Sequence, residues 1–200
     1  MIEFEKKIME NFHLSQKNYE NQFKSYHWDY QISKKENLYK IENLKDFRKN
    51  DLSKGLDDQF YSSEQTIFFF NDLIKEYGEN YILNLLDQEN IGNCKDTFTF
   101  KNKVYSANEL FHIKFLSMIK NYMSFDDKSI ICEIGPGYGS FASKLIKKFN
   151  SKVILIDLPE SNFLSAYYLK KIFPNKKFCL SIDLKNNELK KENISENEII

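Results

Sequence analysis

Two hydrophobic patterns divide the chain near residue 125. Before that point, apolar residues recur at helical spacing among many charged ones, so residues 1–125 are predicted to form a mainly helical region. From residue 126 the pattern changes to short apolar runs that alternate with amphipathic segments, which is typical of a parallel sheet covered by helices. The predicted fold class is therefore α/β with a mainly helical N-terminal extension.

Three short apolar runs in residues 126–200 predict strands at residues 129–134, 153–157 and 177–182. A helical stretch over residues 163–173 lies between the last two, and Pro174 ends it because proline cannot continue a helix. The alternation of strand and helix predicts parallel pairing.

The helix expected between the first two strands has one apolar stripe. Phe141, Leu145 and Phe149 recur every four residues, so they share a face of that helix. Three lysines fall outside the stripe: Lys144, Lys147 and Lys148.

Capping signals predict where two helices of the first region begin. Ser62 with Gln65, and Ser106 with Glu109, each have the spacing of a capping box. The second pair is expected to open a helix over residues 107–123 that leads toward the first predicted strand.

Two segments of the first region are predicted to lack helix. Residues 97–105 carry two short alternating runs around a polar turn at residues 101–103, which favours a hairpin. Residues 51–58 are predicted to form a loop between helices.

Charge and composition exclude several classes of partner. The formal net charge is +0, so no overall field attracts nucleic acid or an anionic membrane. The N-terminal residues lack a signal-peptide pattern, and no apolar stretch approaches the roughly 20 residues of a membrane helix. We expect a cytoplasmic protein with no membrane and no nucleic-acid partner.

Three cysteines, odd in number and far apart, suggest neither a disulfide framework nor a metal site. Cys132 and Cys179 lie in apolar runs and are expected to be buried and inert.

The richest chemistry follows the first predicted strand. Glu133 ends the apolar run, and Gly135, Gly137 and Gly139 follow at alternate positions. Glycines allow a sharp turn and close approach to a ligand, while the next helix presents unsatisfied N–H groups there. Asp157 follows Gly135 by 22 residues, near the offset at which a nucleotide-binding βαβ unit places its ribose-binding acid.

Glu133 discriminates between possible ligands. A carboxylate about 4 Å from a phosphate would repel it by roughly 4 kcal/mol at an effective dielectric constant of 20. Ser140 also stands where the dinucleotide fingerprint has its third glycine. Both features disfavour a dinucleotide, although an NAD-linked oxidoreductase stays the alternative enzyme class.

The glycine segment resembles motif I of the Rossmann-like S-adenosylmethionine methyltransferases. Its residues are Glu133, Ile134, Gly135, Pro136, Gly137, Tyr138 and Gly139. The resemblance implies that S-adenosylmethionine, which carries an ammonium and a sulfonium but no phosphate, lies against this turn. It also implies that Asp157 and Leu158 bind the cofactor, with Asp157 accepting the ribose hydroxyls. Residues 126–200 would then form the first half of the cofactor-binding domain. Asp183 stands where family members place an acid near the adenine, although a purely structural role is favoured for it.

A narrower resemblance, to the sugar O-methyltransferases, covers more of the chain. The matching segments are residues 47–50, 55–58, 89–93, 156–160 and 166–169. Cys94 departs from the pattern, because the family usually has proline there. This resemblance implies O-methylation of a sugar hydroxyl in glycan or polysaccharide synthesis, with a small-molecule or glycan acceptor.

No catalytic residue can be named from the sequence. His27, His112 and Tyr138 could line the acceptor side, with the helical N-terminal region as a lid, and Tyr138 is expected nearest the ligand. His112 is expected to be a core or surface histidine rather than a base, and Trp28 with Tyr30 is expected to be core.

The predicted sheet is incomplete. A methyltransferase sheet of this type has seven strands, whereas the residues after Gly139 supply about half of them, and the fourth is expected to be starting at residues 198–200. We therefore expect a fragment of a longer enzyme whose first strand has an unpaired, aggregation-prone edge. A third hypothesis is a non-catalytic chain that acts in assembly.

Overall fold

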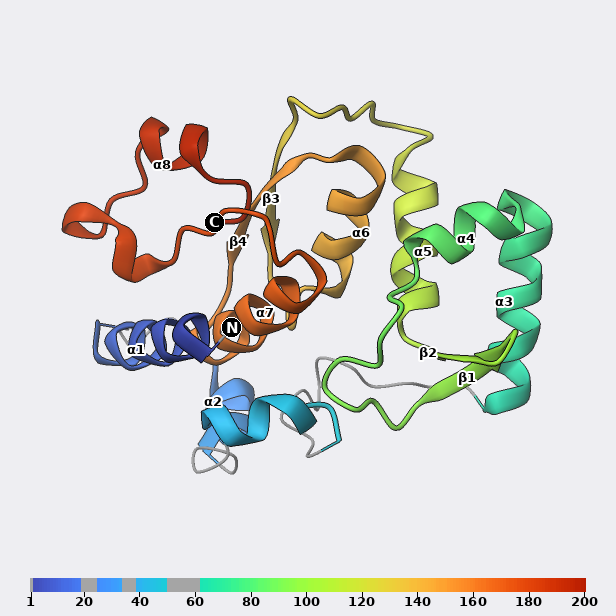
Figure 1. Ribbon diagram of the computed structural model, residues 1–200, viewed down its shortest axis with the longest axis horizontal. Coiled ribbons are helices and arrows are strands. Elements are labelled where there is room, and N and C mark those ends of the chain that lie inside the picture. The colour runs from blue at the N-terminus through green and yellow to red at the C-terminus, as the bar shows by residue number, and fades with distance from the viewer. Residues whose placement is uncertain (1, 19–24, 34–38, 50–61) are drawn as a thin grey trace.

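The computed structural model describes residues 2–18, 25–33, 39–49 and 62–200, and it is a mixed α/β protein (Figure 1). The predicted loop at residues 51–58 and part of the segment at residues 47–50 lie outside the described residues. The first region contains α1 (Ile2–Asn18), α2 (Tyr26–Ser33), the 3-10 helix η3 (Ile41–Asp46), α3 (Ser63–Tyr77), α4 (Glu79–Leu85), β1 (Thr97–Phe100), β2 (Lys103–Ser106) and α5 (Glu109–Ile119).

The first capping box is confirmed. α3 begins at Ser63, and the Ser62 hydroxyl accepts a hydrogen bond from the Gln65 backbone N–H at 3.2 Å. The Gln65 side chain accepts one in return from the Ser62 N–H at 2.8 Å. Two otherwise unpaired donors at the start of the helix are thereby satisfied.

The hairpin is confirmed, and the second capping box is wrong. β1 and β2 pair antiparallel, and the turn residues Lys101 and Asn102 take the left-handed conformation that a tight hairpin needs. α5 begins at Glu109 without a side-chain cap. Ser106 cannot cap it, because it ends β2 and its hydroxyl accepts a hydrogen bond from Arg48 at 2.5 Å.

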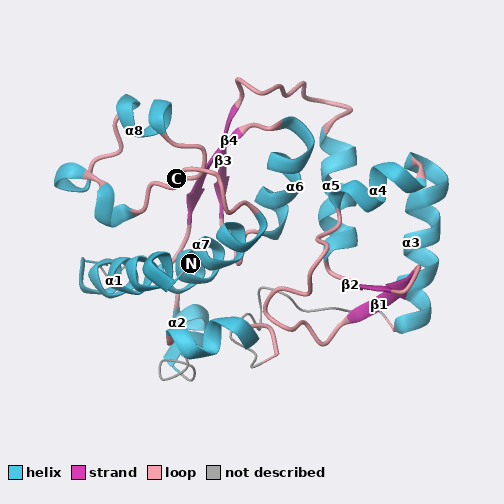
Figure 2. Ribbon diagram, viewed as in Figure 1, coloured by secondary structure: helices cyan, strands magenta, loops and turns pink. Residues whose placement is uncertain are grey.

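The second region alternates strand and helix as predicted. β3 (Ile130–Ile134) and β4 (Lys152–Ile156) pair in parallel and in register, with α6 (Ser140–Phe149) between them in the chain (Figure 2). α7 (Pro159–Ile172) begins earlier than expected, since proline is favoured at the first position of a helix. It ends before Pro174, as predicted.

The predicted strand at residues 177–182 is wrong. Phe178 forms a single bridge with Ile199, which also bridges Val153 of β4, so the C-terminal residues lie between these two segments. After Cys179, whose N–H donates to the Ile199 carbonyl at 2.9 Å, the chain turns, and the Asp183 carboxylate accepts the Leu180 N–H at 2.9 Å. The short elements that follow are η4 (Ser181–Asp183), η5 (Lys185–Asn187) and α8 (Lys191–Glu196).

One hydrophobic core joins the two regions. α5 packs on α6 and α1 packs on α7, and buried residues form one cluster from Ile8 to Ile199. Tyr30 is 48% exposed and Cys132 is exposed, so the expectation that they are buried is wrong, whereas Cys179 is buried. Within the described residues, no helix is long and apolar enough to cross a membrane.

Candidate functional site

The glycine turn connects β3 to α6 through three left-handed residues. Gly135, Gly137 and Gly139 have φ values of 75°, 60° and 88°, which side chains with a Cβ rarely adopt. A Cβ at Gly139 would lie 3.2 Å from side-chain atoms of Leu169 and Ser165 on α7. The glycine therefore permits both the turn and the close approach of α7.

Asp157 follows β4 and contacts the glycine turn directly. Its Oδ2 accepts the Gly137 N–H at 3.0 Å, and its Oδ1 accepts the Leu158 N–H at 2.7 Å. The structure thus brings together the two motifs that the sequence set 22 residues apart. Burial raises the pKa of Asp157 by more than these donors lower it, so the carboxylate lies in a partly dehydrated position.

Glu133 lies one residue before the end of β3. Its Oε2 is buried and has no hydrogen-bond partner among the described residues. Burial, and secondly the charge of Asp157, raises the pKa of Glu133 to about 7. A cation placed here would satisfy an acceptor that the fold leaves unpaired.

Tyr138 belongs to the turn through its backbone alone. Its side chain is 1% exposed, and its ring meets that of Tyr168 edge-on with 4.9 Å between centroids. The Arg48 guanidinium lies 4.8 Å from the ring centroid on another side. The side chain therefore packs in the core, contrary to the expectation that it lies nearest the ligand. Pro136 is also buried, whereas Gly135 is exposed.

His112 is a core histidine, as expected. Its Nδ1 lies 2.9 Å from the hydroxyl of Ser140, the first residue of α6. Burial, followed by the charges of Lys144 and Arg48, lowers the pKa of His112 to about 3, so the ring is neutral near pH 7. The side chain of His27, the other histidine candidate, lies outside the described part of the chain.

A buried ion cluster behind the glycine turn was not predicted. Lys144 of α6 is fully buried, 3.1 Å from the Asp87 carboxylate and 2.5 Å from that of Glu109. Lys147 lies 2.5 Å from the same Asp87 oxygen, and the Tyr168 hydroxyl donates to the other. The sequence places both lysines outside the apolar stripe of their helix, and no local pattern indicates that they meet buried acids at positions 87 and 109.

The charges in this cluster balance one another. Burial alone lowers the pKa of Lys144, but Asp87 and Glu109 outweigh it and the net shift is upward. Burial alone raises the pKa of Asp87, but Lys144 and Lys147 outweigh it and the net shift is downward. Burial and Asp87 raise the pKa of Glu109. Burial, followed by the charge of Lys144, lowers the pKa of Lys147. The cluster therefore favours the charged forms of Lys144 and Asp87, and each of its acids has a lysine within hydrogen-bond distance.

A cavity of about 350 Å³ lies beside Asp157. Its lining residues are Leu14, Ser15 and Asn18 from α1, Asp157, Pro159 and Asn162 from the β4–α7 segment, and Ser181 and Leu184. Asp183 is not among them. Its carboxylate is 2.7 Å from Lys7 and also accepts the Leu180 N–H, so the structural role favoured for it is the one observed.

Compared with protein-family models, with curated proteins and with solved structures, the chain has no match. The resemblance to methyltransferases therefore rests on the residues themselves. Among the described residues, no three His, Cys, Asp or Glu side chains are grouped as they would be to hold a metal ion.

Proposed function

We propose that this chain binds S-adenosylmethionine on a Rossmann-like sheet and acts in O-methyl transfer. The observation that carries the proposal is the buried carboxylate oxygen of Glu133, which has no hydrogen-bond partner in the described part of the chain and lies near Asp157 and the glycine turn. A ligand that brings positive charge to this point satisfies the orphaned oxygen and relieves the repulsion between the two carboxylates.

The same two carboxylates argue against a pyrophosphate-bearing cofactor. Glu133 lies near the carboxyl end of β3 and Asp157 directly follows the neighbouring parallel strand β4, so a ligand on the glycine turn meets both. Each carboxylate about 4 Å from a phosphate would cost roughly 4 kcal/mol at an effective dielectric constant of 20. An NAD-linked oxidoreductase is therefore the weaker alternative.

The residues have distinct roles in the proposed site. Glu133 would hold the positively charged end of the cofactor, and the turn from Gly135 to Gly139 would let the backbone approach it. Asp157 accepts two backbone N–H groups and a hydrogen bond from the Ser161 side chain. A hydroxyl rotates freely, so the ribose hydroxyls would take the remaining acceptor site and the one that Ser161 occupies. When bound, S-adenosylmethionine supplies an electrophilic methyl group for an acceptor oxygen that loses its proton.

The acceptor is proposed to be a sugar hydroxyl, on the strength of the narrower family resemblance. His112 is not a suitable base for that hydroxyl, because it is buried and bonded to Ser140. Exposed aromatic rings suit sugar binding, and Tyr30 on α2 presents one.

Calorimetric titration with S-adenosylhomocysteine tests the cofactor assignment. Replacing Asp157→Ala should weaken binding by about 2 to 4 kcal/mol, because two charge-assisted hydrogen bonds to the ribose are lost. Asp72→Ala, an exposed acid on α3, is the matched control and should leave the affinity unchanged. Equal affinity in both variants would remove Asp157 from the site, and tight binding of NADH instead would overturn the assignment.

A further inference from the structure

Helix α1 is held firmly against the α/β part of the chain. The Asn11 side-chain oxygen accepts the Ile182 N–H at 2.7 Å. Phe12 is buried, with its ring centroid 4.9 Å from that of Phe163 on α7. Both contacts come just before the last turn of α1 in the chain, so they fix where that turn lies.

That last turn and Asp157 line the same cavity of about 350 Å³. Ser15 and Asn18 supply a hydroxyl and an amide to its lining, and Leu14 supplies apolar surface. Asn162 also lines the cavity, and its amide donates to the Asp157 carbonyl at 3.1 Å, which fixes the amide close to Asp157.

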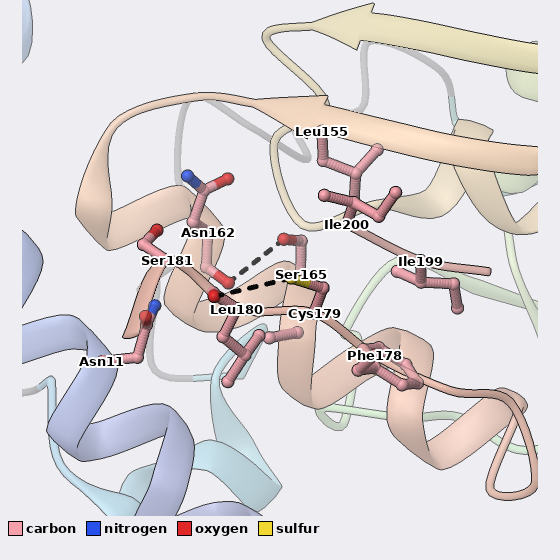
Figure 3. A pocket seen from close by; sticks show the side chains of 11 residues that line it. Asn11, Leu155, Asn162, Ser165, Phe178, Cys179, Leu180, Ser181, Ile199 and Ile200 are labelled. Atoms are coloured by element: carbon pink, nitrogen blue, oxygen red, sulfur yellow. Dashed lines mark hydrogen bonds between the residues drawn. The ribbon is translucent and has the colours of Figure 1, made fainter. Parts of the chain in front are cut away.

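The cavity suits one part of a cofactor better than a whole one. Its volume of about 350 Å³ is near the lower end of the roughly 300–1,000 Å³ range of small-molecule sites. Asn162 and Ser181 also border a smaller cavity of about 60 Å³, which Figure 3 shows with an apolar wall that includes Leu155 and Phe178. A flat heterocycle with a polar edge, attached to a sugar, matches this combination of apolar and polar lining.

We propose that the last turn of α1 is part of the cofactor site, with Ser15 and Asn18 contacting the nucleoside part of the bound cofactor. The inference rests on the proposed function, because that function places a ribose at Asp157. It assigns the N-terminal helix a direct binding role, in addition to its packing on α7.

The test is calorimetric titration of the full chain with two probes, S-adenosylhomocysteine and 5′-methylthioadenosine. The second probe lacks the amino-acid part and therefore reports on the nucleoside contacts alone. Asn18→Ala should lower the affinity for both probes about 3- to 10-fold, the effect of one lost hydrogen bond. Ser15→Phe should lower the affinity for both probes by more than about tenfold, because the introduced phenyl ring takes up space in the cavity.

Two further variants separate the nucleoside contacts from everything else. Lys17→Ala, on the same turn but exposed and outside the cavity lining, should bind both probes like the wild type. Glu133→Gln should change the affinity for S-adenosylhomocysteine and leave that for 5′-methylthioadenosine unchanged, because only the first probe carries an ammonium group.

The outcomes distinguish the inference from the proposed function. If the wild type binds the probes and Asn18→Ala and Ser15→Phe bind like Lys17→Ala, the role of α1 is overturned and the function stands. If the wild type binds neither probe, the function is overturned and this role of α1 with it. Asn18 is exposed, so its variant should keep the fold even if Ser15→Phe lowers the melting temperature.

Discussion

Two groups of charged side chains in this molecule differ in how they are satisfied. Lys144, Asp87 and Glu109 form a cluster in which positive and negative groups lie 2.5 to 3.1 Å apart. Glu133 and Asp157, at the glycine turn, are both acids, and one oxygen of Glu133 has no partner among the described residues. The first group pairs opposite charges within the fold, whereas the second holds two like charges, and we propose that a cation from a ligand satisfies it.

This difference separates a structural role from a binding role. Breaking a satisfied ion cluster leaves a buried charge uncompensated, so its cost appears in the free energy of unfolding. Neutralising an unsatisfied carboxylate removes a cost from the unliganded fold, so its effect appears as gained stability and lost ligand affinity. Variants in the two groups should therefore shift stability in opposite directions.

The largest expected effect is on the cluster. Lys144→Met should lower the free energy of unfolding by about 3 to 5 kcal/mol, because it removes the cation that lies between Asp87 and Glu109. Urea unfolding followed by circular dichroism measures this loss.

Lys148→Met is the matched control on the same helix. Lys148 is exposed, with its ammonium 4.8 Å from the ring centroid of Tyr81, so its loss should cost no more than about 1 kcal/mol. A similar small cost for Lys144→Met would show that the cluster does not stabilise the fold, and the contrast between the two groups would fail.

A smaller effect of opposite sign is expected at the glycine turn. The pKa of Glu133 is raised to about 7 in the fold, so the folded chain keeps a proton that the unfolded chain releases at lower pH. Stability from this group is therefore fully present below about pH 4.5 and is lost as the pH rises toward 7. The difference in free energy of unfolding between Glu133→Gln and the wild type should therefore shift in favour of the variant by about 2 kcal/mol from pH 5 to pH 8.

Unfolding curves at both pH values check this expectation, with Glu196→Gln, an exposed glutamate, as control. The difference between the control and the wild type should not depend on pH. If Glu133→Gln behaves like the control, the carboxylate is already satisfied and the case for a cation site at the turn is lost.

Local signals in the sequence predicted local structure well. The Ser62 capping box, the hairpin around Lys101 and Asn102, and the strands β3 and β4 all follow from the identities of neighbouring residues. The meeting of Asp157 with the glycine turn could also be predicted, since parallel strands in a βαβ unit place their carboxyl ends at one edge.

Features that depend on distant partners could not be predicted. Lys144 is buried because Asp87 and Glu109 approach from other helical segments, and no spacing within α6 reveals this. Tyr138 turns into the core because Tyr168 and Arg48 offer it a packed site there. The segment at residues 177–182 forms only a single bridge, from Phe178 to the distant Ile199, and no local pattern identifies that partner.

The central claim, that the glycine turn holds a cation through Glu133, is tested most directly by calorimetric binding of S-adenosylmethionine to the wild type and to Glu133→Gln at pH 6 and pH 8. Glu133 ionises within this range, so the account predicts that the advantage of the wild type over the variant grows about 3- to 10-fold from pH 6 to pH 8. Equal affinities of the two proteins at both pH values, or no binding by the wild type, would contradict it.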